Sequence, residues 1–124
     1  MKINFEEFEV VKPVTRKQVK PVLSILKNGD FAINSELRNS IKTSKFEVRL
    51  KKDCTQILLI PNGEVMTDVG KNNRIKNYAV FNKLVGRKIK IPAYYVGRWN
   101  DENECWIGEL VTENPNKASK KVVK

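Results

Sequence analysis

The chain has 124 residues, and its 24 Lys and Arg against 14 Asp and Glu give a formal net charge of +10. A hydrophobic content of 40% in well-spaced segments predicts one globular domain that buries a core without cross-links. No apolar run reaches the roughly 20 residues that cross a bilayer, and the acidic N-terminus lacks a signal-peptide pattern, so we expect a cytoplasmic protein and no membrane partner.

The first 21 residues predict an N-terminal strand and a basic connector. Residues 3–11 hold several apolar side chains that are available for packing, and we expect them to form an edge strand. Residues 12–20, which follow, contain four cations, and the prolines at 13 and 21 favour an extended connector over a helix. The cations of this connector are either solvated or in contact with phosphates.

Residues 22–61 open with a predicted hairpin. The segment 22–26 is apolar and partly β-branched, and Asn28-Gly29 is a strong signal for a two-residue turn. An apolar strand resumes at Phe31. The two strands are therefore expected to pair directly across the turn.

A short helix and a second pair of strands complete this unit. Asn34 or the serine after it can cap a helix of barely two turns, in which Leu37 and Ile41 share one face. The alternation over residues 46–50 and the apolar run over 57–60 predict two strands. The order is strand, strand, helix, strand, strand.

The pattern N-G-x-F-x-I-x-x-E-L-R in this unit resembles the AbrB/MazE/MraZ (SpoVT-AbrB) family of bacterial DNA-binding modules. Two such units interlock in that family, so the resemblance implies a swapped-hairpin β-barrel. It covers residues 22–61. Asp30 stands where the family often has Arg, and Asn34 stands where it usually has Pro.

Residues 62–113 predict a second unit with the same order of elements. These elements are expected over residues 64–68, 74–75, 78–85, 88–96 and 106–111. Apolar positions of the two units match at a constant shift of 43 residues: Leu37 with Val80, Ile41 with Leu84, Phe46 with Ile89 and Val48 with Ile91. This indicates a tandem duplication packed in one domain, or else a single unit followed by an unrelated helix and hairpin.

The end of the chain and the oligomeric state complete the structural expectations. Residues 114–124 lose the large apolar side chains and gain Lys, which is typical of a basic disordered tail. Because one unit of the resembling family is incomplete alone, we expect either a homodimer or an internally duplicated chain.

Signatures of catalysis are thin. The chain has no His and no nucleotide-binding or nucleophile-elbow motif. Cys54 and Cys105 stand far apart without a CxxC pair, which argues against a zinc site or a disulfide and favours two free thiols. We therefore expect no enzyme activity, no catalytic residue, no metal and no cofactor.

The distribution of charge points to a polyanion. Residues 12–52 carry eleven cations against three acids, and residues 71–98 carry eight cations and no acid. Such segregation favours nucleic acid, because neutralised phosphates release condensed counterions. General solubility is the alternative explanation.

Candidate nucleic-acid contacts lie on turns, on the first helix and near strand ends. Cations of the loop between the first two strands enter the DNA major groove in the resembling family, and Asn and Arg side chains can read base edges. The candidates are Lys27, Asn28, Arg38, Arg49, Lys71, Asn73, Arg74, Arg87 and Lys88. Asn28 is equally a plain turn former, and Arg38 can instead pair with Glu36 or Glu47.

Aromatic residues of the last hairpin suggest a rival mechanism. Exposed aromatics among cations on a small barrel stack single-stranded bases, and Tyr95 and Trp99 are candidates for such stacking. Trp106 is expected in the core, since apolar residues surround it.

Together these patterns predict a mainly β fold with short helices that binds double-stranded DNA without catalysis, as a transcriptional regulator or an antitoxin-like protein. One alternative is a small barrel that binds single-stranded DNA or RNA. The other is a protein-interaction or structural component, such as one from a phage or mobile element, whose acidic loop at 101–104 meets a basic partner.

Overall fold

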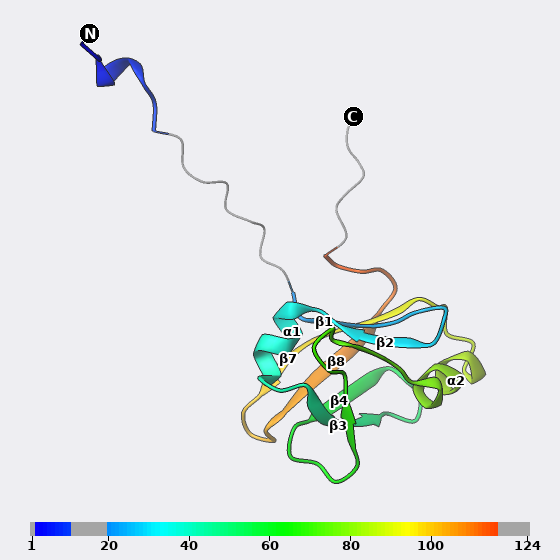
Figure 1. The fold of residues 1–124 in the computed structure, drawn as a ribbon. Coiled ribbons are helices and arrows are strands. Elements are labelled where there is room, and N and C mark those ends of the chain that lie inside the picture. Colours follow the sequence, from blue (N-terminus) through cyan, green and yellow to red (C-terminus); the bar gives the residue numbers. More distant parts are fainter. Residues whose placement is uncertain (1, 11–19, 117–124) are drawn as a thin grey trace.

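The strands form one antiparallel sheet that curls into a nearly closed barrel around an apolar core. The computed structural model describes residues 2–10 and 20–116 (Figure 1). Its strands are β1 (Val22–Ile25), β2 (Asp30–Ile33), β3 (Lys45–Leu50), β4 (Gln56–Ile60), β5 (Met66–Asp68), β6 (Arg74–Lys76), β7 (Ala93–Asn100) and β8 (Cys105–Val111). The helices are α1 (Ser35–Ile41) and α2 (Tyr78–Gly86). The predicted fold class, mainly β with short helices, is confirmed.

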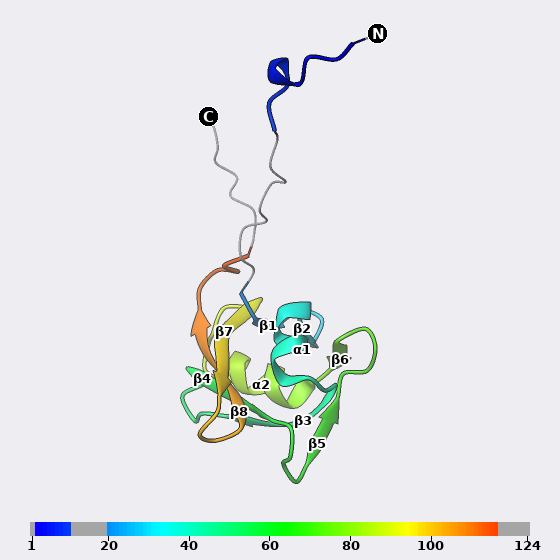
Figure 2. The ribbon, with the colours of Figure 1, turned by 90° about the vertical axis from the view of Figure 1, so that its left-hand side faces the viewer.

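The two edges of the sheet meet where the chain turns from β5 into β6. The strand order is β5-β3-β4-β8-β7-β1-β2-β6, and Figure 2 shows both edge strands on the same side of the barrel. The Arg74 amide donates to the Val69 carbonyl oxygen at 3.2 Å across the turn between them. The barrel therefore closes through this turn and not through a ladder between β5 and β6.

The strand order contains an internal two-fold repeat. The hairpins β1–β2 and β3–β4 alternate around the barrel with β5–β6 and β7–β8. Exchanging each strand of the first half for its counterpart in the second half preserves every ladder except β1–β2, because its counterparts β5 and β6 are joined by a turn and not by a ladder. The axis of this repeat passes between β2 and β6, where Asp30 faces Lys76 and the Ile33 amide donates to the Asn73 carbonyl oxygen.

Both helices begin with the same asparagine cap. Asn34 Oδ1 accepts a hydrogen bond from the Leu37 amide at 2.9 Å, and Asn77 Oδ1 accepts one from the Val80 amide at 3.1 Å. The caps satisfy amides that the first helical turn leaves unpaired. Both pairs are separated by the predicted shift of 43 residues, and each helix buries its predicted apolar face.

The shift of 43 residues does not continue into the last hairpin, so the predicted matches of Phe46 with Ile89 and Val48 with Ile91 are wrong. The amides of residues 87–89 donate back to carbonyl oxygens of α2, and Pro92 has no amide to offer a ladder. The strand therefore begins at Ala93 and not at residue 88. The hairpins β3–β4 and β7–β8 are instead related by a shift of 49 residues. The pair Arg49 and Leu58 in the first corresponds to the pair Arg98 and Ile107 in the second.

The chain ends differ from the prediction. In place of an edge strand over 3–11, the described residues 2–10 contain a 3-10 turn at Phe5–Glu7, with Phe5, Phe8 and Val10 exposed. Asn116, expected in a disordered tail, accepts a hydrogen bond from the Lys20 amide at 2.9 Å and donates one to its carbonyl oxygen at 2.8 Å. Residues 11–19 of the connector region and residues 117–124 of the tail lie outside the described residues.

The core contains large aromatic side chains from both halves. Phe31, Phe46, Tyr95 and Trp106 are fully buried. The Tyr95 hydroxyl donates to the Cys54 carbonyl oxygen at 2.7 Å, and burial raises the pKa of this hydroxyl. Cys54 and Cys105 are buried free thiols, as the sequence predicts.

Replacing Tyr95 with Phe tests this buried hydrogen bond. The Cys54 carbonyl oxygen loses its side-chain donor, so we expect the free energy of unfolding to fall by about 1–3 kcal/mol. Urea unfolding measures the change as a lower midpoint at an unchanged m-value. Tyr94→Phe is the matched control, because the half-buried Tyr94 hydroxyl bonds no other described residue. Equal stability of the two variants would contradict the prediction.

The two caps provide a second test. Asn77→Ala removes one cap and is expected to cost about 1 kcal/mol. Asn34→Ala should cost more, about 2–3 kcal/mol, because Asn34 also accepts from the Val22 amide at 3.1 Å and donates to the Lys20 carbonyl oxygen at 2.8 Å. Thermal and urea unfolding of both variants measure the difference, and a larger loss for Asn77→Ala would refute the prediction.

Candidate nucleic-acid interface

The outward side of β2 and β6, with the turns at either end, brings several predicted residues together. We call this surface the axial face, because the internal two-fold axis crosses it. It comprises Lys27, Asn28, Asp30, Lys71, Arg74 and Lys76. Gly29 lets the β1–β2 turn pack under α2, since its φ is +87° and a Cβ there would lie 2.5 Å from the Tyr78 ring.

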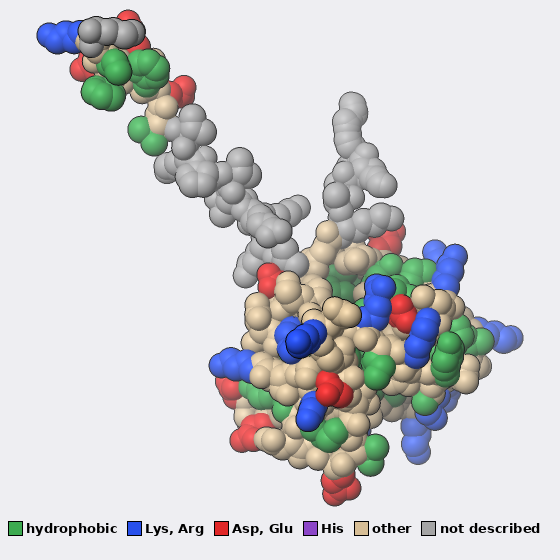
Figure 3. Space-filling view, in the orientation of Figure 1, with side chains coloured by type: hydrophobic (Ala, Val, Ile, Leu, Met, Phe, Trp, Pro, Cys, Tyr) green, Lys and Arg blue, Asp and Glu red, His purple; other side chains and the backbone are tan. Residues whose placement is uncertain are grey.

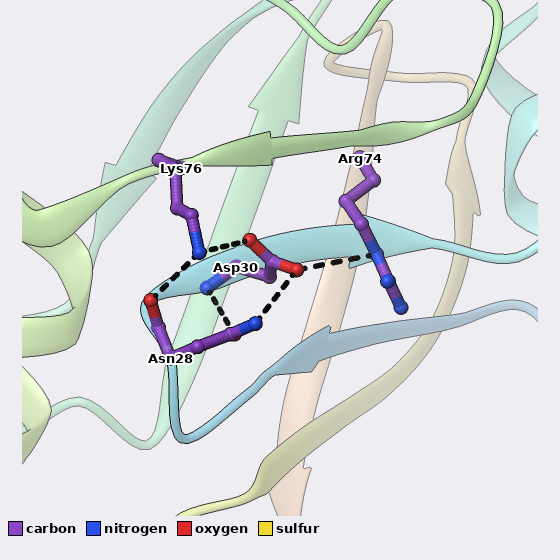
Figure 4. A network of polar contacts seen from close by, with 4 residues as sticks. All are labelled: Asn28, Asp30, Arg74 and Lys76. Carbon is purple, nitrogen blue, oxygen red and sulfur yellow. Dashed lines mark hydrogen bonds and ion pairs between the residues drawn. The ribbon is translucent and has the colours of Figure 1, made fainter.

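One carboxylate organises the centre of the axial face (Figure 4). Lys76 Nζ lies 3.0 Å from Asp30 Oδ1, and Arg74 Nε lies 3.5 Å from Asp30 Oδ2. The hydrogen bond from Lys76 is the main reason that the pKa of Asp30 lies below its usual value. Asp30 is therefore ionised in the folded protein at neutral pH, although only 6% of the residue is exposed.

Asn28 has the structural role that the sequence left open. Its side chain accepts from the Asp30 amide at 3.1 Å and donates to the Asp30 carboxylate at 3.2 Å. Its carbonyl oxygen accepts from Lys76 Nζ at 3.0 Å. Because these bonds occupy its amide group, Asn28 shapes the turn and is not free to read a base edge.

The cations of the axial face remain accessible. The side chains of Arg74 and Lys76 are 54% and 51% exposed despite their contact with Asp30. Lys27 and Lys71 are exposed on the two turns and form no ion pair with any residue that the structure describes. The face thus presents four accessible cations, of which Arg74 and Lys76 contact Asp30 and Lys27 and Lys71 lie on the two turns.

Arg38 and Asn73 hold the barrel together. The Arg38 guanidinium donates to the Gly70 carbonyl oxygen at 3.0 Å and to Asn73 Oδ1. Asn73 adopts a left-handed backbone conformation, with φ at 59°. Arg38 therefore fastens the β5–β6 turn to α1 and pairs with neither Glu36 nor Glu47, the alternative partners that its sequence position offered.

The remaining predicted cations lie away from the axial face. Arg49, on β3, pairs with Glu47 at 3.0 Å. Arg87 and Lys88 are exposed at the C-terminal end of α2. On the face shown in Figure 3, Lys and Arg gather around α2 and the β1–β2 turn, while most acidic side chains lie on the opposite side and along the lower edge.

The aromatic hairpin offers little surface for stacking bases. Tyr95 is fully buried, so its predicted stacking role is wrong: its place in the register points it into the core. Trp99 is partly buried and packs against the core. Trp106 is fully buried, as the sequence predicts.

Sequence reasoning missed Lys76 and the part that Asp30 plays. Asn28, Gly29 and Asp30 contain the relevant signal, because an Asn two residues before an Asp commonly bonds it across a turn. The cations that join Asp30 come from β6, more than forty residues away in sequence. Local pattern alone does not identify such partners.

No three His, Cys, Asp or Glu side chains within 2–10 and 20–116 come close enough to hold a metal ion. None of the helices in these ranges is long and apolar enough to cross a membrane.

Comparisons of the chain with protein-family models, curated proteins and solved structures give no match.

The ionised state of Asp30 leads to a pH-dependent stability. A carboxyl with a lowered pKa stabilises the fold above its unfolded value of about 3.8, and this contribution is lost as pH falls through the lower folded value. We expect Asp30→Asn to remove this part of the acid sensitivity. Urea midpoints measured between pH 7 and pH 2 should therefore fall less steeply below pH 4 in the variant than in the wild type. Parallel pH profiles would contradict the assignment.

Proposed function

We propose that this protein binds double-stranded DNA without catalysing a reaction, and that the axial face is its main contact. The observation that carries the proposal is a set of four accessible cations: Arg74 and Lys76 beside Asp30 on the β2–β6 pair, with Lys27 and Lys71 on the turns at its two ends. Phosphates are the natural partners of such a surface, because their neutralisation releases counterions.

The dimensions of the axial face suit a duplex. The two turns lie at opposite ends of the β2–β6 pair, whose paired stretch is about 10 Å long at the usual rise of a strand. The DNA major groove is about 12 Å wide. Lys27 on one turn and Lys71 on the other can therefore contact the backbones on the two sides of one groove.

The barrel topology supports kinship with the AbrB-like family. Hairpins from the two halves alternate around the barrel, as expected for swapped hairpins, and the Asn-Gly turn precedes the helix that carries Arg38. We propose that one duplicated chain supplies both units that a dimer provides elsewhere. The biological role would be that of a transcriptional regulator or of the antitoxin-like member of a regulatory pair.

Specificity is expected to be modest. Asn28 and Asn73 form hydrogen bonds within the protein, and Arg38 fastens the β5–β6 turn. The accessible groups are chiefly Lys and Arg side chains suited to phosphates. Binding through such contacts depends strongly on salt and weakly on base sequence.

Removing one cation from each turn tests the proposal. Lys27→Gln combined with Lys71→Gln should weaken binding to a fluorescein-labelled 20-base-pair duplex and reduce the slope of log K against log salt by about 2. Fluorescence anisotropy between 50 and 200 mM salt measures both effects. The matched control is Lys45→Gln combined with Arg98→Gln, which removes two exposed cations elsewhere on the barrel.

The results separate the candidate functions. An unchanged slope in the Lys27 and Lys71 variant would place the contact elsewhere. Tighter binding of a single strand of the same sequence, with quenching of tryptophan fluorescence, would favour the single-strand alternative. No binding of either form at 50 mM salt would refute the proposal and direct attention to a protein partner.

A further inference from the structure

A second basic surface lies where the β3–β4 turn meets the C-terminal end of α2. A hollow of about 390 Å³ opens there, with Leu50 and Cys54 in its lining. The four charged residues that line it are Lys51, Lys52, Lys83 and Arg87. No acidic residue lines it. We call it the basic hollow.

Backbone contacts fix the two walls of the hollow relative to each other. The Cys54 amide donates to the Lys51 carbonyl oxygen at 2.7 Å, and Cys54 has a left-handed φ of 65°. The Cys54 thiol lies 3.8 Å from the Lys83 carbonyl oxygen on α2. The turn and the helix are thus in direct contact, and each supplies two cations to the rim.

The charge of the hollow is not neutralised from within. None of its four cations forms an ion pair with a residue in the part of the chain that the structure describes. Asp53 is the acid on the same turn. Its Oδ1 accepts from the Thr55 hydroxyl at 2.7 Å and from the Thr55 amide at 3.0 Å, and the nearby charge of Lys51 also helps to lower its pKa. Asp53 offsets one of the four positive charges and leaves an excess of three.

Stabilisation of the helix end does not account for these cations. Positive side chains do favour the C-terminal end of a helix, where carbonyl groups are unpaired. Here, however, the amides of Arg87, Lys88 and Ile89 already donate to carbonyl oxygens of the last turn of α2. Lys51 and Lys52 moreover belong to a different element. A bound anion explains all four cations together.

Comparison of the two halves of the repeat shows that the positive charge of the β3–β4 turn is absent from the equivalent turn of the second half. The counterpart of the β3–β4 turn is the β7–β8 turn, which carries Asp101, Glu102 and Glu104 where the first turn carries Lys51 and Lys52. All three acids are exposed. Equivalent turns of one barrel therefore have opposite charge, and only one of them attracts a polyanion.

We propose that the basic hollow binds phosphates of a nucleic-acid backbone, as a second contact for the duplex assigned to the axial face. The inference rests on that proposed function. Helix α2 joins the two surfaces: the Asn77 amide before it bonds the Gly29 carbonyl oxygen of the β1–β2 turn, and its last residues line the hollow. Nine helical residues span about 13 Å, which corresponds to roughly four phosphates of one strand when the length is measured along the duplex axis.

The test compares two variants that each lack two cations. Lys52→Gln combined with Lys83→Gln removes two of the four cations of the hollow. Lys45→Gln combined with Arg98→Gln removes two cations elsewhere and serves as the control. Anisotropy with the same labelled duplex should show a salt slope reduced by about 2 in the hollow variant and unchanged in the control. Amide NMR shifts of residues 50–54 and 83–88 should move on addition of duplex in the wild type and not in the variant.

Failure of this inference is distinguishable from failure of the proposed function. If the Lys52 and Lys83 variant binds duplex with an unchanged salt slope, and the hollow amides of the wild type do not shift on addition of duplex, the inference about the hollow is wrong. The proposal for the axial face is then unaffected. If the wild type binds no duplex, the protein is titrated with inorganic pyrophosphate. Saturable shifts of the hollow amides that are lost in the variant would support a phosphate site in the hollow. The absence of such shifts would refute it. Concentration-dependent shifts at both the hollow and residues 101–104 without nucleic acid would assign the hollow to a second copy and overturn the proposal.

Discussion

Closure of the barrel depends on how the short strands β5 and β6 are fastened. Each has three residues, and no ladder joins them, although unpaired strand edges readily attract other chains. The turn between them, in which the Arg74 amide donates to the Val69 carbonyl oxygen, joins the two edges, and Arg38 on α1 braces this turn by donating to Gly70 and Asn73. A guanidinium is well suited to this task, because its fixed fork of donors can hold two acceptors at once.

This closure also determines which polar groups are left for a ligand. Arg38 and Asn73 are occupied at the seam, and Asn28 and Asp30 are occupied at the neighbouring turn. Asp30 is nearly buried between strands, so it needs the cations of β6 to offset the cost of removing a carboxylate from water. Lys27 and Lys71 on the turns form no ion pair with any described residue. Arg74 and Lys76 both pair with Asp30 and remain accessible, so they combine a structural role with a surface available to a ligand.

The sequence predicted the elements whose signals are local. Asn28-Gly29 marked the first hairpin, and the apolar spacing marked both helices, whose Asn34 and Asn77 caps keep the predicted shift. The sequence did not predict features that depend on tertiary contacts. The start of β7 depends on how the chain wraps the end of α2, and the burial of Tyr95 depends on strand register. The partner of Arg38 comes from a turn more than thirty residues away.

The opposite charges of the β3–β4 and β7–β8 turns show what a repeat within one chain permits. A symmetric dimer must present the same surface twice, and its DNA targets are correspondingly palindromic. When both halves belong to one polypeptide, a substitution in one half is not copied into the other. In our proposal, a duplex across the axis meets two different ends of the protein, so it is held in a single orientation and its target need not be a palindrome.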